Sequence, residues 1–233
     1  MATGPVLAQS DISQGVLRGA YVAFPPLTYT DEDGYPAGSL LELANQIATA
    51  TGYHIDWQEM PVRRIHEALR AGHVDIWPTT AGITEIQPWV RETSFPDTPL
   101  RLSAFRLADT PPVSSTDDMM PAAVILLRGY TYLGAANQLL GRTDEMVSRA
   151  SDHKSALRML ANGRGDYLLD FDVPVDQMLA QEPVEGIERN LIAEFRTSYV
   201  FSRKTPQIEK VIESFEQAWR AIEQQQSHSG PAE

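Results

Sequence analysis

The fold is decided by the stretch from Val16 to Trp77, which reads VLRGAYVAFPPLTYTDEDGYPAGSLLELANQIATATGYHIDWQEMPVRRIHEALRAGHVDIW. It opens with a short apolar run that prolines end, since proline cannot continue a central strand. Apolar residues then recur at helical spacing in two segments, and Gly52 and Gly72 stand where those helices should end. The resulting order β-α-β-α-β predicts a parallel sheet covered by helices, and therefore an α/β fold.

The same pattern occurs twice along the chain. In the first half we expect strands at residues 16–23, 53–57, 74–77 and 102–107, and helices at 40–48 and 61–72. Residues 110–115 are rich in proline and serine and mark a boundary. After it we expect strands at residues 122–127, 145–148, 166–169 and 196–202, and helices at 131–140, 152–161 and 206–226. The repetition predicts two α/β lobes.

The last strand and helix have no third unit to join, so we expect them to return to the first lobe. The second lobe is then an insertion, and two chain crossings near residues 105–108 and 195–197 form a hinge. The expected organisation is a tail at 1–13, a discontinuous first lobe at 14–105 plus 197–226, an inserted second lobe at 106–196, and a tail at 227–233. Ligands bind at the carboxyl ends of parallel strands and in clefts between domains, so we expect a hinged two-lobed binder or enzyme.

Composition narrows the function classes. The 233 residues are 42% hydrophobic and 21% charged, as in ordinary globular proteins, and the net charge of −12 disfavours a nucleic-acid partner. With no cysteine, the chain has no disulfide, no cysteine-bound zinc and no thiol nucleophile. Metal-binding spacings of histidine, phosphate-binding loops and nucleophile elbows are also missing from the sequence. We therefore expect no catalytic residue, no metal and no cofactor.

No apolar run is long enough to span a membrane, and no intact signal peptide is recognisable. Residues 1–10 are compatible either with a start codon fused near a former export cleavage site or with a native N-terminus. We expect an exported protein.

Five segments resemble, in order, the extracellular solute-binding proteins of family 3, which are the polar amino-acid receptors of ABC importers. The segments are Leu17–Leu27, Asp33–Ala44, Ala68–Asp75, Thr79–Glu85 and Ala161–Asp166. The resemblance covers about residues 15–222 and looks like a divergent branch. It implies a two-lobed periplasmic-binding-protein-like fold of type II. It also implies a periplasmic monomer that captures a small polar molecule and delivers it to the membrane subunits of an importer.

The resemblance implies ligand contacts in the first lobe. Phe24 stands where an aromatic side chain packs on the ligand, although a core role is equally compatible with the pattern. The family's hydroxyls and backbone amides that bind the ligand's polar head fall at three positions, Thr79, Thr80 and Gly82. Trp77 either lines the cleft or is a buried strand residue.

At one position the sequence departs from the family. Amino-acid receptors carry an arginine there that pairs with the ligand's carboxylate, and this chain has Gln87, or Trp89 if counted from Phe95. The departure puts an α-amino-acid ligand in doubt. Three other arginines could substitute: Arg64, Arg91 and Arg128.

In the second lobe the resemblance implies contacts around Gly129-Tyr130-Thr131, where a strand should run into a helix with free N–H groups. Thr131 fits the family pattern and Tyr130 departs from it. The family's ammonium-binding acid should fall at Phe171, so the acid is either Asp170 or Asp172. Placed together on a strand, these two acids would share one face.

Two other functions remain open. The chain could be a ligand-sensing module for a membrane receptor, or a dehydratase-type enzyme on the same fold. Four aromatic residues near the expected cleft favour a flat or aromatic-stacking polar solute over an ordinary amino acid: Phe24, Trp77, Trp89 and Tyr130.

Overall fold

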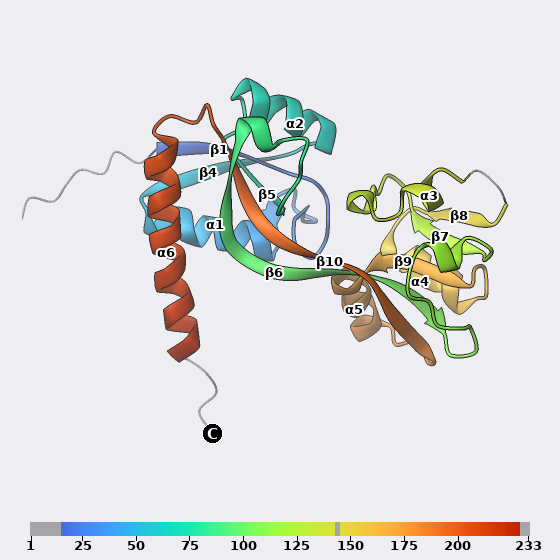
Figure 1. Ribbon diagram of the computed structural model, residues 1–233. Helices are drawn as coiled ribbons and strands as arrows, with labels where there is room; N and C mark the ends of the chain where they lie inside the picture. Colours follow the sequence, from blue (N-terminus) through green and yellow to red (C-terminus); the bar gives the residue numbers. More distant parts are fainter. Residues whose placement is uncertain (1–14, 143–144, 229–233) are drawn as a thin grey trace, which may run out of the picture. The chain divides into compact units, whose positions relative to one another are not determined.

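The computed structural model describes residues 15–142 and 145–228 (Figure 1). The chain divides into two compact units. The first unit joins the residues up to Phe95 with those from Ser198 onward, and the second unit is Pro96–Thr197. The chain thus leaves the first unit once and returns to it, as an inserted unit requires.

A parallel sheet forms the centre of the first unit. β1 (Gly15–Tyr21) pairs in parallel with β4 (Tyr53–Glu59) on one side and with β5 (Ile76–Thr80) on the other. The long strands β6 (Val90–Leu107) and β10 (Ile187–Ser202) pass through both units, and the strand order here is β4-β1-β5-β10-β6. The remaining elements are β2 (Tyr29–Thr30), β3 (Pro36–Ala37), α1 (Ser39–Ala50), α2 (Val62–Ala71), the 3-10 turn η1 (Gln87–Trp89) and α6 (Ile208–His228).

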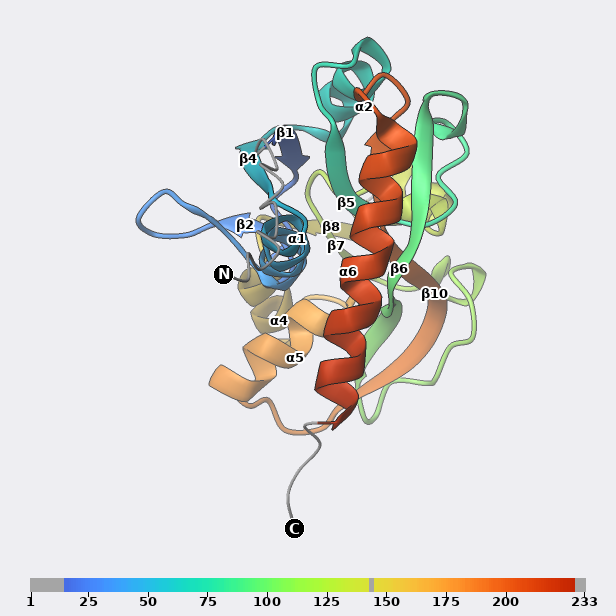
Figure 2. The ribbon, with the colours of Figure 1, turned by 90° about the vertical axis from the view of Figure 1, so that its left-hand side faces the viewer.

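Helices cover both faces of this sheet, and the alternation along each strand explains why. On β10, Tyr199 and Phe201 pack in the cluster that holds the apolar faces of α1 and α6. Val200, which points to the other face, packs in the cluster of α2 residues Ile65 and Leu69. Figure 2 shows α6 running along one side of the sheet. The sheet is therefore buried on both faces, as the apolar strands predict.

The second unit repeats the arrangement on a smaller scale. β7 (Val124–Leu127) pairs in parallel with β8 (Val147–Ala150) and β9 (Tyr167–Phe171), and β6 adds to β9 in the antiparallel direction. Four further elements are short: η2 (Asp117–Met119), η3 (Tyr132–Gly134), α3 (Asn137–Leu140) and α4 (His153–Ala161). α5 (Asp172–Gln181) lies beside α4 (Figure 2).

In each unit an aspartate that follows a helix-glycine step hydrogen-bonds to the backbone of the middle parallel strand or of the residue just before it. The Asp75 carboxylate accepts the backbone N–H of Arg18 at 2.9 Å, and the N–H of Asp75 donates to the carbonyl of Arg18 at 2.7 Å. In the second unit, Asp166 makes the same two bonds with Ala123, at 2.8 and 2.7 Å. The two helix-glycine-aspartate segments, which resemble the same family pattern, thus make the same pair of backbone contacts in their units.

Two predicted helix ends are confirmed. The side chain of Asp152 accepts the N–H of Ser155 and caps the N-terminus of α4. Gly72 follows α2 in the left-handed conformation, with φ of 78°.

Three element predictions were wrong or incomplete. β6 and β10 begin well before residues 102 and 196, because Pro96 and Pro99 in β6 and polar residues in β10 hid the strand pattern. The helix expected at 131–140 is broken, since Tyr132 and Leu133 adopt positive φ values of 50° and 53°. Asp172 begins α5 instead of continuing the strand, so Asp170 and Asp172 do not share a strand face.

The unit boundaries also differ from the expected ones. The chain first passes from the first unit to the second after Phe95, and not near residues 105–108 as expected. Both places lie on the single long strand β6, whose early start the sequence did not reveal. The predicted tail at 1–13 lies outside the described residues. α6 continues through residues 227 and 228, which we had expected in the C-terminal tail, and the rest of that tail is not described.

Candidate functional site

The carboxyl ends of the parallel strands in the first unit carry most of the residues expected there. The chain leaves β1 toward Phe24, leaves β4 toward the start of α2 with Arg64, and leaves β5 toward Gly82. Because parallel strands end at one edge of their sheet, these residues gather at that edge. Phe24 is half-buried, and its N–H donates to the carbonyl of Thr28 at 2.6 Å. Arg64 is exposed and makes no ion pair or side-chain hydrogen bond within the described chain.

The residues at the end of β5 differ in their access to a ligand. Thr79 is half-buried and Thr80 is 6% exposed. Trp77 is 3% exposed, lies 5.5 Å from the ring of His66 in a tilted arrangement and packs in the core beside α2. This is the core alternative that the sequence left open. Trp77 is therefore a core residue of β5, packed beneath α2.

Gln87 is hydrogen-bonded to Glu92, an acid that the sequence reasoning did not single out. The side-chain amide of Gln87 donates to Glu92 Oε2 at 3.1 Å, and the backbone N–H of Gly82 donates to the same oxygen at 2.9 Å. Arg91, one of the three candidate arginines, pairs instead with Glu209 of α6 at 3.1 Å. An ion pair within the unit thus occupies Arg91.

The second unit has a matching edge at the carboxyl ends of β7, β8 and β9. Tyr130 follows β7, His153 follows β8 as the first residue of α4, and Asp170 lies near the end of β9. Since these three strands are parallel, their ends bring the three side chains together.

A chain of two hydrogen bonds links these three residues. Asp170 Oδ2 lies 2.8 Å from His153 Nδ1, and His153 Nε2 lies 2.9 Å from the phenol oxygen of Tyr130. Asp170 is fully buried, so its carboxylate is not directly accessible to a ligand in this structure. Burial raises the pKa of Asp170, although the hydrogen bond from His153 opposes this. Burial and the nearby Asp170 raise the pKa of the Tyr130 phenol, which keeps its proton at neutral pH.

Aromatic rings surround this chain of hydrogen bonds. Tyr130 lies 5.9 Å from Tyr132 and 6.5 Å from Phe171, measured between ring centroids. Tyr132 and Phe171 stack at 6.3 Å, and Phe171 lies 6.4 Å from Phe195. Phe171, which stands at the position of the family's acid, is thus part of an aromatic cluster. Tyr132 and Phe171 are buried, so the cluster packs the interior behind Tyr130.

The remaining candidates of the second unit lie at the same edge. Asp172 Oδ2 is 3.4 Å from Arg189, while its Oδ1 is buried without a hydrogen-bond partner among the described residues. Arg128 and Thr131 are exposed, and Arg128 has no ion pair in the described part of the chain. Because the helix expected after Thr131 is broken, that segment offers no regular helix N-terminus for an anion.

Sequence reasoning missed His153 and Glu92 as parts of this chemistry. His153 could have been found, since the capping residue Asp152 places it directly after a strand that ends at the same edge. Glu92 could not, because its contact with Gly82 depends on how the loop after β5 turns back.

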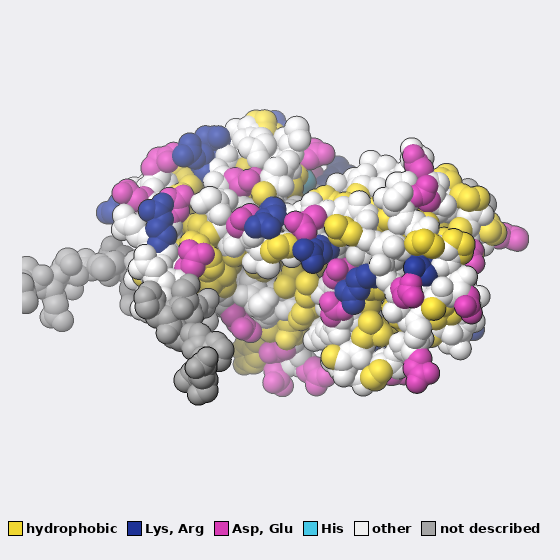
Figure 3. All heavy atoms as spheres, turned by 60° about the horizontal axis from the view of Figure 1, so that its bottom comes forward, with side chains coloured by type: hydrophobic (Ala, Val, Ile, Leu, Met, Phe, Trp, Pro, Cys, Tyr) yellow, Lys and Arg dark blue, Asp and Glu magenta, His cyan; other side chains and the backbone are white. Residues whose placement is uncertain are grey.

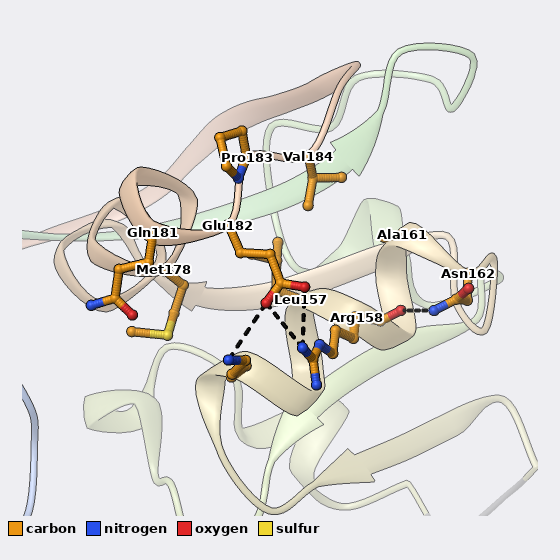
Figure 4. Close-up of a pocket in the computed structure, with 10 residues that line it drawn as sticks. Leu157, Arg158, Ala161, Asn162, Met178, Gln181, Glu182, Pro183 and Val184 are labelled. Carbon is orange, nitrogen blue, oxygen red and sulfur yellow. Dashed lines mark hydrogen bonds and ion pairs between the residues drawn. The ribbon is translucent and has the colours of Figure 1, made fainter.

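A pocket of about 270 Å³ in the second unit lies apart from the expected residues (Figure 4). Residues of α4 and of the segment that ends α5 line it, including Leu157 and Met178. Glu182 is held there by Arg158 at 3.0 Å and by Lys154 at 3.5 Å. None of the sequence-predicted site residues lines this pocket.

Charged groups are mixed over the surface. On the face shown in Figure 3, Lys and Arg side chains lie beside Asp and Glu side chains and do not gather into one basic patch. Within the described ranges, no group of three or more histidine and acidic residues could hold a metal ion. In the same ranges, every helix is too short or too polar to cross a membrane.

Comparison with known families supports the resemblance noted in the sequence. Residues 17–87 match the family described as bacterial extracellular solute-binding proteins, family 3. The resemblance to family 3 is confirmed. A "probable histidine-binding protein" of Neisseria gonorrhoeae is 22% identical over 178 residues, which cover 76% of this chain and 66% of that protein. The aligned part is thus just under two thirds of that relative's length.

Solved structures establish the fold. A histidine kinase sensor domain with similarity to periplasmic binding proteins has a TM-score of 0.69 at 22% identity, and each chain is covered to 92%. The substrate-binding protein of an amino-acid ABC transporter has a TM-score of 0.65 at 19% identity, covering 91% of this chain and 94% of that one. The predicted two-lobed, periplasmic-binding-protein-like fold of type II is therefore confirmed.

Proposed function

We propose that this protein is a solute-binding protein that captures a small polar molecule and delivers it to an ABC importer. The solute is amino-acid-like or is a polar metabolite with a flat, aromatic-stacking part. We place the protein in the periplasm and expect it to act as a monomer, with the membrane subunits of the importer as partners.

The observation that carries this proposal is the set of side chains at the carboxyl ends of the parallel strands in each unit. Each unit brings polar and aromatic side chains to the carboxyl ends of three parallel strands, where α/β sheets bind ligands. The proposed ligand contacts are Phe24 and Thr79 in the first unit and Tyr130 and Asp172 in the second. Arg64 and Arg128 are exposed residues close to these contacts in the chain's strand-end segments. The match to an extracellular solute-binding family supports the same reading.

The chemistry at these edges fits binding better than catalysis. Asp170 and His153 resemble the acid-base half of a catalytic triad, but their third partner is a phenol whose pKa burial raises. Such a phenol is a poor nucleophile at neutral pH. We therefore propose that the solute leaves chemically unaltered, which mass spectrometry after prolonged incubation would check.

One comparison favours a second candidate function. The histidine kinase sensor domain covers the chain to 92%, as well as the transporter protein does. A sensing module would bind the same kind of solute but would dock on a membrane receptor. Stimulation of ATP hydrolysis in an importer reconstituted in vesicles separates the two functions, because only a transport partner produces it.

A thermal-shift screen tests the proposal. A solute that binds the folded chain stabilises it by RT ln(1 + [L]/Kd), which is about 2.7 kcal/mol at a hundredfold excess over Kd. A chain of this size gains about 2–4 °C in Tm for each kcal/mol. We expect at least one polar metabolite to raise Tm by about 5 °C or more. Failure of a broad metabolite panel to raise Tm would count against solute binding.

A further inference from the structure

The carboxylate of Glu92 accepts hydrogen bonds from two N–H donors in the loop that follows β5. Glu92 Oε2 accepts the backbone N–H of Gly82 at 2.9 Å and the side-chain N–H of Gln87 at 3.1 Å. Glu92 lies on β6, and both donors lie in the loop between β5 and β6. All three residues belong to the first unit.

These donors are the ones that an acidic group of a solute would need. Gly82 stands just past the carboxyl end of β5 with φ of 78°, and no atom lies within 4 Å of the place where a Cβ would be. A backbone N–H exposed in such a turn binds anions. A carboxylate of the solute would have to displace Glu92 and then remain beside a like charge, and both effects oppose its binding.

Glu92 also offers acceptor capacity of its own. Its second oxygen, Oε1, has no hydrogen-bond partner among the residues described, and a carboxylate accepts about four hydrogen bonds. The side chain is only partly buried, so it can be reached. An ammonium or another N–H group at this edge would meet a charged acceptor.

An independent observation in the second unit points the same way. Asp172 Oδ1 is buried and has no partner in the described chain, although Oδ2 lies 3.4 Å from Arg189. A buried acceptor without a donor requires one, from water or from a ligand. Asp172 Oδ1 is therefore an acceptor in the second unit that still lacks an N–H partner among the described residues.

Resting on the proposed function, we infer that the solute is a small amine or other nitrogen cation without a carboxylate, and that Glu92 determines this preference. The inference accounts for the residue at position 87. Gln87 binds Glu92 and not the solute, so a positive charge at that position would neutralise the acceptor that the solute needs.

Matched pairs of solutes test this inference, because histamine differs from histidine, and agmatine from arginine, only by the α-carboxylate. We expect titration calorimetry on the full chain to show at least one amine binding about tenfold or more tightly than its amino acid, the ratio that one charge-assisted contact gives. Glu92→Gln keeps the shape and removes the charge, so the ratio should fall to about one. The matched control Glu85→Gln, an exposed acid of the same loop, should leave the ratio unchanged.

Gln87→Arg gives a second test that does not depend on the folding of the Glu92 variant. The new guanidinium should pair with Glu92 and weaken amine binding by about tenfold. Tighter binding of histidine or arginine by the unaltered protein, or an unchanged ratio in Glu92→Gln, would overturn the inference and leave solute binding intact. If both pairs fail to bind, the inference fails; the proposed function fails only if the broad metabolite panel is also without effect.

Discussion

Replacing His153 by alanine should destabilise the second unit strongly, because it removes the partner of a buried acid. Asp170 has no exposed surface, and His153 Nδ1 lies 2.8 Å from its carboxylate. Removing one member of a buried charged pair costs about 3–5 kcal/mol. Asp170→Asn should cost less, about 1–2 kcal/mol, since an amide oxygen can still accept from His153.

The double variant shows whether the two residues act together. Once the acid is neutral, the loss of His153 no longer leaves a buried charge. The cost of His153→Ala and Asp170→Asn combined should therefore fall short of the sum by about 2 kcal/mol. Urea denaturation followed by circular dichroism measures each free energy of unfolding. The matched control His73→Ala removes an exposed histidine and should cost less than about 0.5 kcal/mol.

The pH dependence follows from the raised pKa of Asp170. Burial is the largest cause of that rise, and His153 opposes it, so the pKa of Asp170 rises further in His153→Ala. An acid with a raised pKa in the folded state lowers stability as pH rises above its unfolded pKa, about 3.9. The penalty of the variant should be small below about pH 4 and should grow as the pH rises toward neutral. Additive single costs, or a penalty independent of pH, would refute the coupling.

Three further outcomes are expected. Asp75→Asn should lower the free energy of unfolding by about 2 kcal/mol, because Asp75 is buried and accepts hydrogen bonds from Arg18 and Thr205. Asp166→Asn should cost less than half as much, and equal losses in denaturation experiments would contradict this reasoning. Arg64→Ala and Arg128→Ala should change amine affinity in calorimetry by less than about threefold, and a tenfold loss would indicate an acidic group in the solute. Small-angle scattering should show a smaller radius of gyration with bound solute, and an unchanged radius would argue against closure.

The sequence predicted the α/β class, the inserted unit and the strand ends near which the candidate residues lie, since strand periodicity and helix caps are local signals. Asp152 is an example, because its capping role depends only on the residues that follow it. The full lengths of β6 and β10 escaped prediction, since their pairing depends on residues about a hundred positions away, as between Thr98 and Thr197.

The details of the candidate site were harder to predict for the same reason. Asp170 and Asp172 have the same side chain, but the end of β9 buries one beside His153 and places the other at the start of α5. The sequence left Trp77 open between a ligand contact and a buried strand residue, and the packing of α2 on the sheet makes it a core residue. Residue types indicated the kind of chemistry, and tertiary packing decided which atoms are available for it.

The central claim, that the candidate residues of each unit take part in solute binding, is tested most directly by calorimetric titration of the best solute into three proteins. These are the unaltered chain, Phe24→Ala in the first unit and Tyr130→Phe in the second. Removing an aromatic contact or a hydrogen-bonding hydroxyl costs about 1–2 kcal/mol, which is about five- to thirtyfold in Kd. We predict one solute per chain and a loss of this size in both variants. Full affinity in either variant would contradict a role of that residue's unit in solute binding.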